Sequence, residues 1–202
     1  MITPFIVITF TVVYQVFTLW QCRHLRMNIK DISLGGIVCA LTLVLSLIMI
    51  PLPTGATITC GSIIPLMLLA LVYDARLAML CGWICGVLSV FFVPGWQIVH
   101  WGQFFVEHLI CYSCLGYAGV FGSNNRRRVL LGCMLAVMIK IVAHVFSGVL
   151  FFSQNSWAGW GAWGYSAAYN LSAYIPEGII ALAILLVRPL SGIKIAIKGR
   201  SI

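Results

Sequence analysis

Long apolar runs joined by short polar connections dominate this sequence and restrict the folds open to it. Of the 202 residues, 62% are hydrophobic and only 8% are charged, whereas soluble domains usually carry about 25% charged residues. Several runs reach the roughly 20 residues that a helix needs to cross about 30 Å of hydrocarbon. We therefore predict an all-α integral membrane protein with no room for a separate soluble domain.

The apolar runs predict seven helices. They cover residues 3–20, 32–52, 61–73, 76–93, 103–121, 129–152 and 165–187. The first either spans the membrane or lies in the plane of its surface, an alternative that its length leaves open. Residues 55–60 are polar and β-prone, which favours a loop or a re-entrant segment. Pro65 is expected to kink the third helix.

The basic residues indicate how these helices are oriented. Every one of the 12 Lys and Arg residues except Lys140 falls on one side of the predicted topology. Short cytoplasmic loops of membrane proteins carry such an excess of positive charge. The pattern places the N-terminus outside and explains the net charge of +8 without nucleic-acid binding.

Residues that often carry chemistry offer little support for an enzyme. Cys111 and Cys114 form a CxxC, but the α/β context of a redox motif is missing, so the cysteines are interpreted as packing residues. Glu107, His108 and His144 match no spacing typical of metal sites. A small membrane enzyme using Glu107 with His144, or the two cysteines, is the alternative from a different functional class.

Polar side chains nevertheless gather on two neighbouring helices, where ionisable groups are costly and therefore indicate function. One helix face carries Lys140, His144 and Gly148, and the next carries Ser166, Asn170 and Glu177. Lys140 and Glu177 each lie 12 residues from the connecting loop, a depth of about 18 Å at ~1.5 Å per residue. We hypothesise that they form a buried ion pair, since either charge alone would be costly in hydrocarbon.

Aromatic and acidic groups are predicted to converge above that pair. Glu107 enters from another helix at a similar height, and Tyr165 begins the last one. The loop between the two helices contains Trp157, Trp160 and Trp163. Aromatic faces attract cations and stack on flat rings, while a carboxylate neutralises a cation or accepts hydrogen bonds. The sequence therefore predicts a pocket for an aromatic, cationic small molecule near one membrane surface.

The same stretch resembles a known family. Lys140-x3-His144-x3-Gly148 followed by FFSQNSWAGWGAWGYSAAYN (151–170) is similar to the motif of thiamine-specific substrate-binding (S) components of energy-coupling factor (ECF) transporters. Residues 53–71 and 102–122 resemble the family more weakly. The resemblance covers about residues 32–188.

The resemblance implies a six-transmembrane-helix S-component fold that binds thiamine in the bacterial cell membrane. Residues 27–202 would form this domain, with 1–26 as an additional N-terminal apolar helix. Family members join a transmembrane coupling protein and two cytoplasmic ATPases. No GxxxxGK[ST] motif for ATP is present here, so partners would supply the energy, and no cofactor is expected.

The resemblance also assigns roles to individual residues. By position, the family's thiamine-pocket residues correspond to Glu107, Lys140, His144, Gly148, Tyr165, Ser166 and Asn170. The small residues that contact the coupling protein correspond to Gly36 and Ala40.

Two pocket positions depart from the family pattern. Phe152 stands where the family has Trp, and His108 where it has Tyr; Trp96 is a candidate replacement for a missing aromatic wall. These changes leave open whether the ligand is thiamine, a thiamine analogue or a hydroxymethylpyrimidine precursor.

Overall fold

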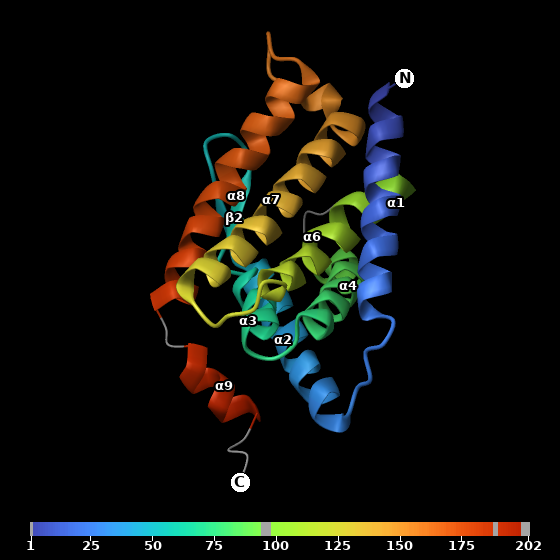
Figure 1. Cartoon of the computed structure of the whole chain (residues 1–202). Helices are drawn as coiled ribbons and strands as arrows, with labels where there is room; N and C mark the ends of the chain where they lie inside the picture. The colour runs from blue at the N-terminus through green and yellow to red at the C-terminus, as the bar shows by residue number, and fades with distance from the viewer. Residues whose placement is uncertain (1, 94–97, 188–189, 199–202) are drawn as a thin grey trace.

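The computed structural model describes residues 2–93, 98–187 and 190–198, and nearly all of its regular structure is helical (Figure 1). The longer helices are α1 (Ile2–Cys22), α2 (Ile29–Leu47), α3 (Ile64–Val72), α4 (Ala75–Phe92), α7 (Arg126–Phe151), α8 (Ala162–Val187) and α9 (Leu190–Lys198). Among the described residues, α1, α2, α4, α7 and α8 are long and apolar enough to cross a membrane. The chain is therefore a multi-pass, all-α membrane protein, as predicted.

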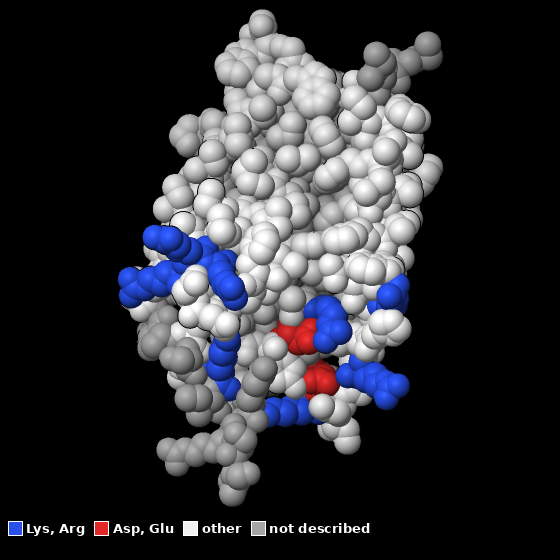
Figure 2. All heavy atoms as spheres, viewed as in Figure 1, with Lys and Arg blue, Asp and Glu red and all other residues white. Residues whose placement is uncertain are grey.

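The two ends of the helix bundle differ in charge. The start of α1 and the loop between α7 and α8 lie at one end, and α9 and the connection between α1 and α2 lie at the other (Figure 1). Figure 2 shows Lys and Arg side chains gathered at the second end on the visible face. We call this the basic end. Its position agrees with the one-sided distribution of positive charge predicted from the sequence.

A short β-hairpin replaces the last turn predicted for the second helix. α2 ends at Leu47, and β1 (Met49–Pro51) pairs antiparallel with β2 (Thr57–Thr59), with Ile50 opposite Ile58. The prediction of helix to residue 52 was therefore wrong. Pro51 and Pro53 explain the difference, because a residue that precedes proline disfavours the helical conformation. The β-prone character predicted for residues 55–60 is found in β2.

Pro65 begins a helix rather than bending one. It lies in the first turn of α3, where the missing N–H has no partner to lose, so the predicted kink was wrong. The following turn is set by Asp74, whose Oδ1 accepts hydrogen bonds from the backbone N–H groups of Arg76 (2.7 Å) and Leu77 (3.1 Å) and thereby caps α4.

The helix predicted over 103–121 has an irregular backbone. It consists of α5 (Trp101–Gln103), a π-helical turn η1 (Phe104–Leu109), α6 (Ile110–Ser113) and a 3₁₀ helix η2 (Cys114–Gly119). Gly132 of α7 allows η2 to approach closely, because a Cβ at this glycine would lie 2.0 Å from the carbonyl oxygen of Ala118. Small residues at such crossings are typical of membrane helix packing, while π-helical turns occur frequently at functional sites.

Helix α1 runs lengthwise beside the bundle (Figure 1) and contacts α4, α6, η1 and α7. Two hydroxyl pairs join it to the irregular segment: Tyr14 Oη lies 2.9 Å from Ser113 Oγ, and Thr18 Oγ1 lies 2.8 Å from Tyr117 Oη. All four groups are buried. Its orientation favours a membrane-spanning role over an in-plane one.

Candidate binding cavity

A cavity of about 450 Å³ lies among α7, α8, η1 and the β-hairpin. Eight of the ten predicted substrate-binding residues line it. They are Glu107, Lys140, His144, Gly148, Phe152, Tyr165, Ser166 and Asn170. Most of them come from the antiparallel helices α7 and α8. Their spacing along each helix follows the 3.6-residue period, which was the basis for predicting that they share a face.

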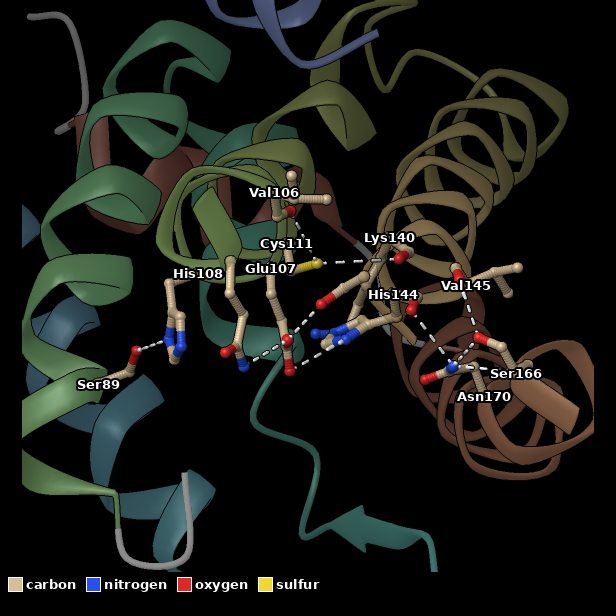
Figure 3. A network of polar contacts seen from close by, with 12 residues as sticks. Ser89, Val106, Glu107, His108, Cys111, Lys140, His144, Val145, Ser166 and Asn170 are labelled. Carbon is tan, nitrogen blue, oxygen red and sulfur yellow. Dashed lines mark hydrogen bonds and ion pairs between the residues drawn. The ribbon is translucent and has the colours of Figure 1, made fainter. Parts of the chain in front are cut away.

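Glu107 lies at the centre of the polar network (Figure 3). Its Oε2 accepts hydrogen bonds from Ser147 Oγ at 2.6 Å and from Gln103 Nε2 at 2.9 Å. Its Oε1 lies 3.8 Å from His144 Nδ1. Two neutral donors thus hold one oxygen of the carboxylate, while the other faces an imidazole.

The His144 ring contributes a flat wall. It stacks on Tyr174 with ring centroids 4.4 Å apart and an interplanar angle of 21°. Its Nε2 is buried and has no hydrogen-bond partner among the described residues. A buried polar atom without a partner is costly, so this nitrogen is a candidate for contact with a ligand or water.

Lys140 and Glu177 both line the cavity, but the predicted ion pair is not formed. The Lys140 ammonium lies over the ring of Tyr174 at 4.8 Å and that of Tyr112 at 5.6 Å. Glu177 accepts a hydrogen bond from the hydroxyl of Thr59 in β2. The ion-pair hypothesis was wrong because the rings supply a cation–π environment for the lysine and the hairpin supplies a donor for the acid.

Ser166 and Asn170 connect α8 to α7. Ser166 Oγ donates to the carbonyl of Val145 at 2.8 Å, and Asn170 Nδ2 donates to the carbonyls of Ser166 (2.8 Å) and His144 (3.3 Å). Gly148 permits this approach, since a Cβ there would lie 2.2 Å from Ser166 Oγ. These residues therefore fix the spacing of the two helices as well as lining the cavity.

The hairpin closes one side of the cavity through contacts with α8. Thr54 Oγ1 lies 3.0 Å from Ser172 Oγ, and Tyr169 Oη donates to the carbonyl of Gly55 at 3.1 Å. Together with the bond from Thr59 to Glu177, these contacts attach the hairpin along about two turns of α8.

A model of the family described as "Thiamine transporter protein (Thia_YuaJ)" matches residues 32–196. The chain belongs to this thiamine transporter family. The match spans the cavity and begins within α2, so α1 lies ahead of the region that the family model covers.

Two members of the thiamine transporter family illustrate the relationship. The thiamine transporter ThiT of Bacillus subtilis (strain 168) is 23% identical over 146 residues, covering 66% of this chain and 75% of that protein. The solved structure of ThiT from Listeria monocytogenes has a TM-score of 0.69 at 20% identity, over 80% of this chain and 93% of the other. The second match supports the fold.

In this family member, the remaining predicted residues lie elsewhere. His108 points away from the cavity toward α4, where its Nδ1 lies 3.2 Å from Ser89 Oγ (Figure 3). The geometry therefore gives His108 no place in the cavity wall, because it follows Glu107 directly and neighbouring helical residues face different sides. Trp96 lies outside the described residues. Gly36 and Ala40 are exposed on α2.

Trp157, Trp160 and Trp163 do not line the cavity, and Trp163 lies in the first turn of α8 and not in the predicted loop. Trp157 packs edge-on against Tyr165, with centroids 5.1 Å apart. Trp160 and Trp163 expose 49% and 47% of their surface. These exposed fractions are typical of aromatic residues at a membrane–water interface.

Sequence reasoning missed several cavity residues. They are Gln103, Tyr112, Ser147, Tyr174 and Thr59. Helical spacing could have found two of them, since Ser147 is three residues from His144 and Tyr174 is four from Asn170. Thr59 had no such signal because its position depends on the hairpin.

Proposed function

We propose that the chain is the high-affinity thiamine-binding component of an ECF-type vitamin-uptake transporter in the bacterial cell membrane. Membership of the thiamine transporter family supports the ligand class. The observation that carries the proposal is the Glu107 carboxylate, held by Ser147 and Gln103 inside a cavity with aromatic walls.

The lining groups suit the chemistry of thiamine. Its aminopyrimidine offers an exocyclic amine to the carboxylate of Glu107, and its flat rings suit the faces of His144, Phe152 and Tyr165. Its thiazolium cation gains from aromatic surroundings. Asn170 and Ser166 then act as orienting groups on α8.

Coupling to partners forms a second part of the proposal. With no ATP-binding motif in the sequence, a transmembrane coupling protein and two cytoplasmic ATPases would drive release. Gly36 and Ala40 support a docking face on α2: both are exposed, and apart from the adjoining backbone of α2 no described atom lies within 4 Å of where a Gly36 Cβ would stand. Small residues let a partner helix approach closely. Residues 27–202 would be the six-helix core and 1–26 an addition to it.

Binding to the purified full chain tests the ligand. Titration calorimetry with thiamine should give saturable binding that Glu107→Gln weakens by at least about tenfold, the effect of losing one charge-assisted hydrogen bond. Asp74→Asn, an acid-to-amide change at the α4 cap, is the matched control and should bind like the wild type. Equal affinity of Glu107→Gln and wild type would refute the assigned role of the acid.

A hydroxymethylpyrimidine precursor is the second candidate ligand, because it also presents an aminopyrimidine to Glu107. Competition separates the two. If the precursor displaces thiamine only at high excess, thiamine is supported as the substrate. If the precursor binds more tightly than thiamine, the precursor is the substrate, and the cavity remains the binding site. An enzymatic role has less support: the thiols of Cys111 and Cys114 are buried and directed at the carbonyls of Lys140 (3.8 Å) and Cys111 (3.4 Å).

A further inference from the structure

A second cavity lies at the basic end, outside the site already described. Its volume is about 560 Å³, and its walls come from the connection between α1 and α2 and from the starts of α2 and α4. Its charged residues are Arg26, Lys30, Asp31, Asp74 and Arg76. We propose that this cavity binds a phosphate-bearing anion, as found in an anionic phospholipid headgroup.

The two carboxylates in the cavity are already occupied by protein donors. Asp31 accepts hydrogen bonds from the Tyr73 hydroxyl and, at 2.8 Å, from the backbone N–H of Asn28. The Tyr73 bond raises the pKa of this phenol, so it stays protonated as a donor. Asp74 accepts from the N-terminal N–H groups of α4 and pairs with Arg76 at 3.2 Å.

Each acid also lies in the first turn or at the cap of a helix. Asp31 belongs to the capping box of α2, and Asp74 caps α4. The positive ends of both helices therefore offset part of the acidic charge. The carboxylates thus complete the walls of the cavity, and Asp74 engages one side-chain nitrogen of Arg76.

The cationic groups, by contrast, retain unused donors. Arg26 makes no hydrogen bond or ion pair with any other described residue, which leaves its five N–H groups free. Lys30 donates to the carbonyl of Ile197 in α9, leaving two ammonium protons. Arg76 uses one side-chain nitrogen for Asp74. The carboxylates already accept hydrogen bonds from protein donors, whereas the cationic side chains keep free N–H groups, so the cavity favours binding of an anion. Phosphate is suited to it because its oxygens can accept two parallel hydrogen bonds from the planar guanidinium of arginine.

The position of the cavity favours a ligand at the membrane surface. Trp20, on the last turns of α1, receives the Arg23 guanidinium 4.7 Å from its ring centre, an arrangement typical of a membrane–water boundary. Basic pockets between helices on the cytoplasmic side bind anionic headgroups. Arg26 belongs to residues 1–26, ahead of residue 32 where the family match begins, so the cavity is built partly by the N-terminal addition.

Lipid binding to the delipidated full chain tests the proposal directly. Native mass spectrometry with phosphatidylglycerol and phosphatidylcholine should show retention of the anionic lipid in preference to the zwitterionic one. Arg26→Gln should reduce this retention about tenfold, and Arg26→Gln/Arg76→Gln further. Arg127→Gln, a basic-end change on α7 that does not line the cavity, should retain lipid like the wild type. Arg26 is exposed, so its replacement leaves folding intact.

A second arm identifies the source of the phosphate. One outcome is that inorganic phosphate raises the unfolding temperature of the wild type but not of Arg26→Gln, while phosphatidylglycerol does not bind. In that case the ligand is a soluble phosphate, and the cavity is its binding site. Equal lipid retention and equal thermal response in Arg26→Gln, the double variant and Arg127→Gln would overturn the proposal. Thiamine affinity is measured in parallel and should not change, so this outcome is independent of the proposed transport function.

Discussion

Ser147 and Glu107 join a regular helix to an irregular one: the serine on α7 donates to the acid in the π-helical turn η1 over 2.6 Å. The bond uses Glu107 Oε2, which Gln103 also contacts, and leaves Oε1 on the side of His144. The acid is thus positioned by neutral donors from two elements, which fixes its direction without neutralising its charge.

Removal of the Ser147 hydroxyl should leave the Glu107 carboxylate less firmly held in the cavity. We expect Ser147→Ala to weaken thiamine binding about tenfold, because a hydrogen bond to a charged group contributes about 1.5 kcal/mol. Calorimetry measures the change. Ser33→Ala on α2, whose hydroxyl bonds only the carbonyl of its own helix at Ile29, is the control. Wild-type affinity in Ser147→Ala would mean that Gln103 alone positions the acid.

Lys140 and Glu177 should behave as independent residues. Since neither is the other's partner, Lys140→Met and Glu177→Gln are expected to change the free energy of unfolding additively, within about 0.5 kcal/mol. Chemical denaturation of the single and double variants in detergent measures the coupling. A coupling energy well above that value would indicate that the two charges interact through the cavity.

The approach of η2 to α7 should tolerate no side chain. In Gly132→Ala, the new Cβ would meet the backbone carbonyl of Ala118 at 2.0 Å, so the helices must separate, and we expect a loss of about 2 kcal/mol or more. Gly36→Ala is the matched helical control, because its added methyl group would meet no described atom beyond the adjoining backbone of α2. Thermal unfolding should show a lower midpoint for the first variant only.

The attachment of α1 should depend on its buried hydroxyls. Thr18→Val leaves the Tyr117 hydroxyl without its partner in a buried position, which costs about 1–3 kcal/mol. Thr18→Val/Tyr117→Phe removes both groups and should recover much of that loss. Thr9→Val, whose hydroxyl bonds the carbonyl of Phe5 within α1, serves as the control. If all three variants unfold at the same temperature, the hydroxyl pair does not hold the helix.

Much of the cavity followed from helical periodicity. Lys140, His144 and Gly148 share a face, as do Ser166 and Asn170, and regular α-helices carry both sets, so residue spacing translated directly into position. The hairpin did not follow, because strand pairing between residues 49–51 and 57–59 depends on contacts with α8 that no local pattern encodes. Thr59, the partner of Glu177, was missed for that reason.

The irregular segment shows a second limit. A spacing argument treats 103–121 as one α-helix, whereas the chain changes from α to π to 3₁₀ geometry within it. These changes come from packing: η2 lies against α7 at Gly132, and η1 carries Glu107 beside Ser147. The acid itself was predicted correctly to lie near the helix pair, but its donors required the three-dimensional arrangement.

The π-helical turn also sets how this segment can change length during evolution. A π turn holds one residue more than an α turn, so loss of a single residue from Phe104–Leu109 would restore regular α geometry. Because a π turn and an α turn each complete about one revolution, the elements before and after η1 would keep their relative orientation. Where the lost residue lies between Gln103 and Glu107, the two would be three residues apart, a spacing at which helical side chains still share a face. Loss of one residue from this turn is therefore expected to change which side chains within the turn face the cavity and to leave the rest of the segment in place.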